Sequence, residues 1–250
     1  MAGTERATDR GLTYDAEFFQ RVSSSARRSA AAMLDELERL VTPSSVLDVG
    51  CGLGSWLAEW RSRGVTDVYG IDGEYVDLAS LEIPHENFQA MDLSQLSEPF
   101  DLGRQFGLVQ SLEVAEHLEE RNAASFVASL VRHSDTVLFS AAIPGQGGDS
   151  HVNEQWPTYW IRLFAEHGYL PYDVVRPRIW TDQRIDWWYR QNALLFARTG
   201  SFGTPGAVDL VHPEMLNNIQ RGNIGLRELL RQAYPAISIA VKKRLPWSST

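Results

Sequence analysis

Cysteine, lysine and long apolar runs are scarce in this chain of 250 residues. Cys51 is its single cysteine, which excludes a disulfide within the chain and favours a reducing compartment. No apolar run approaches the roughly 20 residues that span a membrane, and the polar opening MAGTERATDRG lacks the apolar stretch of a signal peptide. We therefore expect a soluble, cytoplasmic protein without a membrane span.

Positive charge is also in short supply. The chain has 23 Lys and Arg against 32 Asp and Glu, which gives a formal net charge of −9. A protein that follows a nucleic-acid backbone needs a basic surface, so we expect no nucleic-acid partner. The locally basic stretch 221–244 is typical of a solvated surface, and the sequence leaves open whether copies of the chain form a homo-oligomer.

Short apolar runs alternate with segments of helical periodicity over most of the chain. The expected helices cover residues 26–41, 113–132 and 157–167, besides one that follows the glycines near residue 50. The expected strands cover residues 45–49, 68–71, 87–90, 106–111, 136–141, 172–175 and 192–197. This alternation predicts an α/β fold with an open, doubly wound sheet of mainly parallel strands.

We expect one domain over residues 1–250. Residues 1–42 would form an N-terminal helical lid, residues 43–199 the core and residues 200–250 a C-terminal extension after a linker rich in glycine, serine and proline. Tyr14, Phe18 and Phe19 fit a lid that closes over a ligand, and they fit a hydrophobic staple at a helix start equally well.

The stretch VLDVGCGLGSW places three glycines directly after the first expected strand. Gly50, Gly52 and Gly54 let the backbone approach a ligand and point helix amides at it. Their G-x-G-x-G spacing differs from the G-x-G-x-x-G of nicotinamide-binding folds. Asp48, inside the strand, would repel a diphosphate but hold a cationic amino group. The stretch therefore favours S-adenosylmethionine as ligand over a nicotinamide dinucleotide, and a methyltransferase over a nicotinamide oxidoreductase.

Two further acids follow the next two expected strands. Asp72 ends the second strand, where it can accept hydrogen bonds from ribose hydroxyls, and Asp92 follows the third, where it can accept from an adenine amino group. Each aspartate could instead cap a helix or lie in a solvated loop, and each glycine could serve turn geometry alone. Cys51 has no basic neighbour and is interpreted as a small packing residue.

On these residues the chain, over about residues 40–198, resembles the class I S-adenosylmethionine-dependent methyltransferases. The resemblance implies a Rossmann-like, seven-stranded, doubly wound sheet, mostly parallel with one antiparallel edge strand, with helical appendages at both ends. It implies S-adenosylmethionine as cofactor. The residues that it assigns to cofactor binding are Asp48, Gly50, Gly52, Gly54, Asp72, Gly73, Met91, Asp92, Leu93, Ser111 and Leu112.

An E-x-x-E-H string follows the fourth expected strand. Glu113, Glu116 and His117 would share one face at the start of a helix, and His151, in the loop after the fifth strand, would reach the same side of the sheet. The string resembles that of ubiquinone-pathway O-methyltransferases and of plant small-RNA 2′-O-methyltransferases.

That second resemblance implies that Glu113, Glu116, His117 and His151 hold Mg²⁺ or Mn²⁺, a cation that would bind acceptor oxygens and lower the pKa of a hydroxyl. Two alternatives remain open. His117 or His151 could be a catalytic base without a metal, since imidazole titrates near neutral pH, or the E-H pair could be purely structural.

Aromatic residues are concentrated in two segments, HVNEQWPTYW and IDWWYRQN. Their rings suit a sugar or a flat natural product, although core packing could account for part of them. Both segments resemble methyltransferases of bacterial polysaccharide and secondary-metabolite pathways. We therefore expect methyl transfer to a hydroxyl of a small molecule, with an N-methyltransferase or a non-methylating member of the fold as alternatives.

Overall fold

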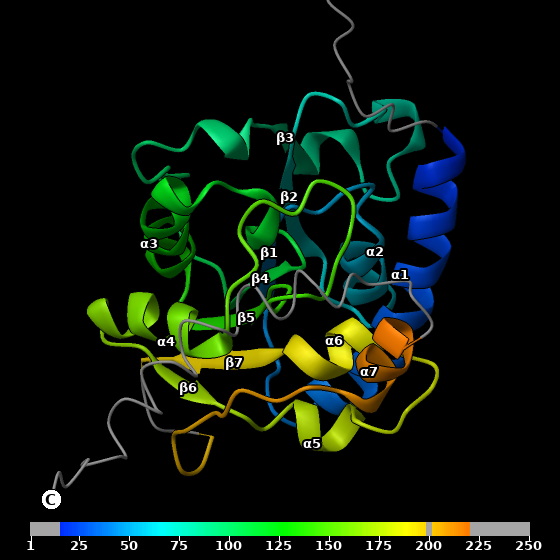
Figure 1. Ribbon diagram of the computed structural model, residues 1–250. Coiled ribbons are helices and arrows are strands. Elements are labelled where there is room, and N and C mark those ends of the chain that lie inside the picture. The colour runs from blue at the N-terminus through cyan, green and yellow to red at the C-terminus, as the bar shows by residue number, and fades with distance from the viewer. Residues whose placement is uncertain (1–15, 199–201, 221–250) are drawn as a thin grey trace, which may run out of the picture.

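The structure is a computed structural model that describes residues 16–198 and 202–220 (Figure 1). A seven-stranded sheet with the order β3-β2-β1-β4-β5-β7-β6 forms its centre. The strands are β1 Ser45–Val49, β2 Asp67–Asp72, β3 Phe88–Ala90, β4 Leu108–Leu112, β5 Thr136–Ser140, β6 Leu170–Tyr172 and β7 Leu194–Ala197. The α-helices are α1 Ala16–Leu37, α2 Ser55–Ser62, α3 Ala123–His133, α4 Pro157–Glu166, α5 Arg176–Ile179, α6 Trp187–Asn192 and α7 Pro213–Gln220.

The expected fold class is confirmed. Strands β3, β2, β1, β4 and β5 pair in parallel, and β7 runs antiparallel to both of its neighbours, β5 and β6. The antiparallel strand thus lies one position inside the edge, because β7 inserts between β5 and the edge strand β6.

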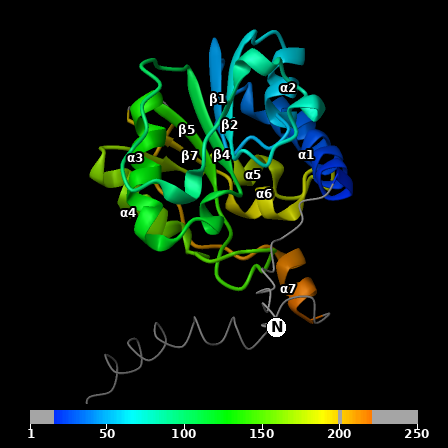
Figure 2. The same ribbon diagram turned by 90° about the horizontal axis from the view of Figure 1, so that it is seen from above.

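Helices cover both faces of the sheet (Figure 2). On one face α1 and α2 pack through residues such as Met33, Leu37 and Trp60, and on the other α3 and α4 pack through Phe126 and Phe164. Strand β1 is buried along its whole length, including the polar Ser45 and Asp48, as expected for a central parallel strand with helices on both faces.

The helix expected over residues 113–132 is the main error in the secondary structure. Glu113 has a left-handed backbone (φ 57°), two short 3-10 turns follow at η4 Ala115–His117 and η5 Glu120–Asn122, and α3 begins only at residue 123. The Glu116 carbonyl accepts hydrogen bonds from Val152 N (2.9 Å) and Asn153 N (3.0 Å) of the loop after β5. That oxygen is therefore taken from the i→i+4 pattern of an α-helix.

The appendages at both ends are described in part. Helix α1 packs along α2, and Met215 and Ile219 of α7 pack against Ile143 in the loop after β5. Tyr14 and residues 221–250 lie outside the described residues, and the side chains of Phe18 and Phe19 lie outside them as well. No helix in the described ranges is long and apolar enough to cross a membrane.

Candidate functional site

The glycine loop connects β1 to α2 at the carboxyl end of the sheet. Gly50 and Gly54 have φ of 86° and 83°, a left-handed backbone that favours glycine. A Cβ at Gly50 would lie 2.3 Å from Cγ2 of Val114, so the loop after β4 packs directly on the glycine loop. Cys51 is buried, and burial raises the pKa of its thiol well above the usual range, which agrees with a packing role.

Asp48 lies at the base of this loop with 2% of its surface exposed. Its Oδ2 accepts a hydrogen bond from Nε2 of Gln110 (2.9 Å), whose Oε1 accepts from Nε1 of Trp60 (2.9 Å). Burial raises the pKa of Asp48 to about 7, against the effect of Gln110 and with a further contribution from the charge of Asp72. A cationic group beside Asp48 would offset the cost of ionising it.

Asp72 connects the end of β2 to the same loop. Its Oδ2 accepts from Gly52 N (2.6 Å), and its Oδ1 accepts from Gly73 N (2.7 Å) and from the hydroxyl of Tyr75. The structure therefore places Asp48, Asp72 and the glycines together, as the resemblance implies.

The other positions assigned to the cofactor surround this group. The exposed Asp92 caps the 3-10 turn η3 Leu93–Gln95 by accepting from Ser94 N (2.9 Å), and Met91 N donates to the carbonyl of Asp72 (2.7 Å). The hydroxyl of Ser111 donates to the carbonyl of Val49 (2.8 Å). The positions with buried side chains in this group are Leu93, Ser111 and Leu112.

A second cluster lies after β4 and β5. The candidate ligand atoms of Glu116, His117 and His151 all lie within 4.8 Å of one another. Glu116 is completely buried, and no side chain of the described residues donates a hydrogen bond to its carboxylate. The backbone amides of Glu116 and Ala142 lie near it and act to lower its pKa. Burial raises the pKa of Glu116 well above its usual value, and the carboxylate of Glu113 adds to this shift.

The two histidines of this cluster meet edge to face, with ring centroids 4.9 Å apart and an interplanar angle of 88°. His117 lies at the solvent-exposed edge of the cluster. Partial desolvation by the surrounding protein lowers its pKa to about 4, and the neighbouring His151 contributes. His117 is therefore neutral near pH 7, the form of imidazole that can bind a metal or accept a proton.

Glu154 belongs to the site and was missed in the sequence. Its Oε1 accepts from Nδ1 of His151 (2.9 Å), and its carboxylate also accepts from Gly145 N (2.7 Å) and Gly147 N (2.8 Å). Burial works against ionisation, but these hydrogen bonds lower the pKa of Glu154. With Nδ1 donating, Nε2 of His151 keeps its lone pair, and a carboxylate in this relation to a histidine is typical of metal sites. The i,i+3 spacing of H-V-N-E was the available signal.

Glu113 is separated from the other three predicted ligands. Its Oε2 accepts from Nε2 of Gln146 (2.8 Å), and its Oε1 accepts from Nδ2 of Asn192 (3.0 Å). Gln191 and Asn192 at the end of α6 are buried and extend this polar network toward His212, whose backbone amide donates to Oε1 of Gln191 (2.7 Å). The left-handed turn at Glu113 replaces the helical spacing that would have aligned it with Glu116.

The aromatic residues divide between core and surface. Trp160 and Tyr189 are buried, and Tyr189 packs edge to face on Trp56 with centroids 5.2 Å apart. Core packing therefore accounts for these rings. Trp187 and Trp188, at the start of α6, are half-buried.

Comparison with known proteins identifies the family. A family model described as a methyltransferase domain matches residues 23–192. No curated protein matches the chain significantly in sequence. Among solved structures, magnesium protoporphyrin IX methyltransferase of Synechocystis with bound S-adenosylmethionine superposes with a TM-score of 0.51 at 20% identity, over 76% of this chain and 87% of that one.

Two further structures share the fold. The methyltransferase domain of a bacterial protein, CtHen1-C, has a TM-score of 0.51 at 17% identity over 70% of this chain and 100% of its own. An O-methyltransferase family protein of Burkholderia thailandensis has a TM-score of 0.51 at 15% identity over 75% of this chain and 61% of its own. With its matching domain, sheet order and glycine loop, this chain belongs to the methyltransferase-domain family and is a class I S-adenosylmethionine-dependent methyltransferase.

Proposed function

We propose that this enzyme transfers a methyl group from S-adenosylmethionine to a hydroxyl of a small-molecule acceptor, and that Glu116, His117 and His151 hold a divalent cation, Mg²⁺ or Mn²⁺, at the reaction site. One observation carries the proposal. The buried carboxylate of Glu116 lies beside two imidazoles, and no side chain of the described residues donates a hydrogen bond to it.

A buried carboxylate without a side-chain donor is costly in the folded state. Ionising such a group costs several kcal/mol, which is why burial raises its pKa, and a bound cation would offset this cost. Mixed oxygen and imidazole donors suit Mn²⁺ in particular. The ring of His151 packs directly on Gly148, because a Cβ at this position would lie 2.3 Å from Nε2. The donor set and the hydrogen bond from His151 to Glu154 thus fit a metal ion.

The proposed site has a cofactor half after β1 and an acceptor half after β4, and these two strands are neighbours in the sheet. We assign Asp48 to the amino group of the cofactor, Asp72 to its ribose and the segment Met91–Leu93 to its adenine. Val114, in the loop that leads to Glu116, packs on Gly50. The methionine end of the cofactor would therefore lie next to the cluster that receives the acceptor.

Methyl transfer is an in-line displacement at a carbon already activated by the sulfonium, so the protein mainly aligns the acceptor and manages its proton. A bound divalent cation supplies Lewis acidity, which lowers the pKa of a hydroxyl. Glu154 would keep His151 in one tautomer, and Asp48 would fix the methionine end of the cofactor in line with the acceptor. A hard cation favours an oxygen acceptor over an amine.

Direct measurement of Mn²⁺ binding tests the metal site before any acceptor is known. Calorimetry should show one Mn²⁺ per chain, and Glu116→Gln should weaken binding at least about tenfold because a neutral amide replaces the anionic ligand. Glu119→Gln is the matched control, since Glu119 is exposed and pairs with Arg121 at 3.1 Å. Absence of Mn²⁺ binding, or equal binding by Glu116→Gln and wild type, contradicts the proposed metal site.

Product analysis tests the acceptor atom. NMR of the product should show an O-methyl resonance, activity should be lost after chelation and Mn²⁺ should restore it. Full activity in EDTA would favour His117 or His151 as a metal-free base, and an N-methyl product would contradict transfer to a hydroxyl. Tight cofactor binding without release of S-adenosylhomocysteine for any acceptor would identify a non-methylating member of the fold.

A further inference from the structure

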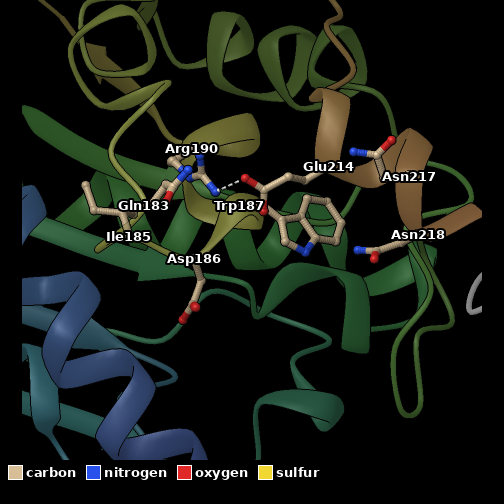
Figure 3. A pocket seen from close by; sticks show the side chains of 8 residues that line it. All are labelled: Gln183, Ile185, Asp186, Trp187, Arg190, Glu214, Asn217 and Asn218. Atoms are coloured by element: carbon tan, nitrogen blue, oxygen red, sulfur yellow. Dashed lines mark hydrogen bonds and ion pairs between the residues drawn. The ribbon is translucent and has the colours of Figure 1, made fainter.

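A cavity of about 410 Å³ lies between α6, the segment before it, and α7 (Figure 3). Its volume falls within the range of about 300–1,000 Å³ typical of small-molecule sites. The residues that line it are Gln183, Ile185, Asp186, Trp187, Arg190, Glu214, Asn217 and Asn218.

Trp187 gives this cavity an aromatic surface. The ring packs against the apolar cluster of Ile143, Met215 and Ile219 and is only half-buried. Figure 3 shows it between the side chains of Arg190 and Asn218. An indole face in such a position can stack on the apolar face of a sugar ring.

Three side-chain amides also line the cavity. Asn217 and Asn218 come from α7, and Gln183 comes from the segment before α6. Each amide offers two donors and an acceptor, which match the alternating donor and acceptor character of sugar hydroxyls. An aromatic face surrounded by amides therefore favours a neutral polyhydroxylated ligand over a flat apolar one.

The charges in the cavity also disfavour an anion. Arg190 donates from Nη2 to Oε1 of Glu214 (2.6 Å), so its charge is already compensated. Asp186 accepts from Ser29 Oγ (3.0 Å) and adds a second acid. Asp186 is itself paired with Arg28, which donates from Nη2 to its Oδ1 (3.2 Å). The charges in the lining are therefore already paired, and no unpaired cation of the lining is left to bind a phosphate or carboxylate. The buried Nε of Arg190 has no acceptor among the described residues, and a ligand hydroxyl could satisfy it.

Helix α6 connects the cavity to the reaction site. Trp187 is its first residue and Asn192, which hydrogen-bonds Glu113, is its last. Six helical residues extend roughly 9 Å at 1.5 Å per residue. An acceptor with one ring in the cavity could therefore place a neighbouring ring near the Glu116 cluster.

From this arrangement we propose that the cavity between α6 and α7 is the acceptor subsite and binds a neutral sugar ring through Trp187, Asn217 and Asn218. This inference rests on the proposed function, because it names the class of acceptor: a glycoside whose adjacent unit carries the hydroxyl to be methylated.

Ligand binding without turnover tests the subsite. The full chain, saturated with S-adenosylhomocysteine, is titrated with the methyl glycosides of glucose, galactose, mannose and rhamnose and followed by saturation-transfer NMR. At least one glycoside should bind. Trp187→Leu, which keeps an apolar side chain, and the double variant Asn217→Ala with Asn218→Ala should each weaken that binding about tenfold. Affinity for S-adenosylhomocysteine should be unchanged in both.

Asn87→Ala, at a partly buried asparagine next to β3, serves as the matched control and should bind the glycoside like the wild type. The inference is overturned if no glycoside binds, or if the two pocket variants bind as tightly as the wild type. The Asn217 and Asn218 substitutions lie on α7 and remove no core side chain, so they remain informative if Trp187→Leu folds poorly. Because no methyl transfer is measured, failure of the proposed O-methylation appears separately, in the Mn²⁺ and product experiments.

Discussion

Nδ1 of His151 donates a hydrogen bond to Oε1 of Glu154 over 2.9 Å, and in the neutral imidazole this contact leaves Nε2 as the nitrogen that can bind a cation. The two residues lie in one loop after β5, three positions apart. Glu154 in turn is held by two backbone amides of that loop, from Gly145 and Gly147. Backbone amides of the loop thus hold Glu154, and Glu154 orients the ring of His151.

Glu154→Gln tests this orientation. The amide keeps the size of the side chain but can turn its NH₂ group toward His151, which removes the preference for the tautomer with Nδ1 protonated. We expect Mn²⁺ affinity and methyl transfer to fall about 10- to 100-fold, as for other carboxylates that support metal-binding histidines. Glu166→Gln, at the exposed end of α4, is the control and should behave like the wild type. Unchanged Mn²⁺ binding in Glu154→Gln would show that His151 needs no such support.

Gly148→Ala tests the space beside His151. The added Cβ would lie 2.3 Å from Nε2, so the ring must move out of the cluster, and we expect Mn²⁺ binding to weaken at least about tenfold. Gly206→Ala is a close control, because its φ of 153° is similar to the 159° of Gly148 and no atom lies within 4 Å of its Cβ position. In calorimetry Gly148→Ala should lose Mn²⁺ affinity, whereas Gly206→Ala should bind Mn²⁺ like the wild type.

The raised pKa of Asp48 predicts that binding of the cofactor releases a proton. Its pKa is about 7 in the unliganded enzyme because it is buried, and the ammonium group of S-adenosylhomocysteine would stabilise its ionised form. Below pH 7 binding should therefore release close to one proton, and affinity should rise with pH, by up to about tenfold per unit, until it levels off near pH 7.

Calorimetry in buffers of different ionisation enthalpy measures this proton release. In Asp48→Asn we expect the released proton and the pH dependence to disappear and the affinity to fall. Asp67→Asn, an exposed aspartate at the start of β2, should keep both. Proton release that persists in Asp48→Asn would assign the titrating group elsewhere.

His133 lies away from the site, and its protonation should make the free energy of unfolding depend on pH. The ring is buried, Nδ1 donates to the carbonyl of Ser129 (2.6 Å) and Nε2 accepts from Leu102 N (2.9 Å). The contact with Leu102 requires the neutral imidazole, because a protonated Nε2 cannot accept a hydrogen bond. Burial lowers the pKa of His133 below its usual 6.5, although the hydrogen bond to Ser129 and the charge of Asp101 oppose this shift. Between that lowered pKa and 6.5 the unfolded chain binds more protons than the folded one.

The contribution of His133 to the free energy of unfolding should therefore be complete above pH 6.5. Below pH 6.5 the free energy of unfolding should fall, by at most about 1.4 kcal/mol per pH unit. His133→Gln keeps a donor and an acceptor but cannot titrate, so its unfolding free energy should fall less between pH 6.5 and 5. His167→Gln, at an exposed histidine, should retain the wild-type slope. Chemical denaturation across this pH range measures the difference, and equal slopes in all three proteins would contradict the assignment.

The grouping of the residues proposed to bind the cofactor could be predicted because these residues lie at the ends of strands or directly after them. Asp48 and Asp72 end neighbouring parallel strands, and Gly52, in the loop after Asp48, hydrogen-bonds Asp72. Parallel strands bring their carboxyl ends to one edge of the sheet, so local order along the chain was enough to place these residues together.

The reaction half depended on contacts between distant segments. Helical periodicity suggested that Glu113 and Glu116 share a face, but the carbonyl of Glu116 is engaged by the loop after β5, and no helix forms there. Glu113 instead meets Asn192, 79 positions away.

The sequence by itself thus determined the sheet, the glycine loop and the two acids beside it, since each follows from short-range order and strand alternation. Only the tertiary structure decided that Glu116 is buried without a side-chain donor, that Glu154 orients His151 and that α6 and α7 enclose a polar cavity. These features arise where separate segments pack together and compete for the same hydrogen-bonding groups, and no periodicity in the sequence records the outcome of that competition.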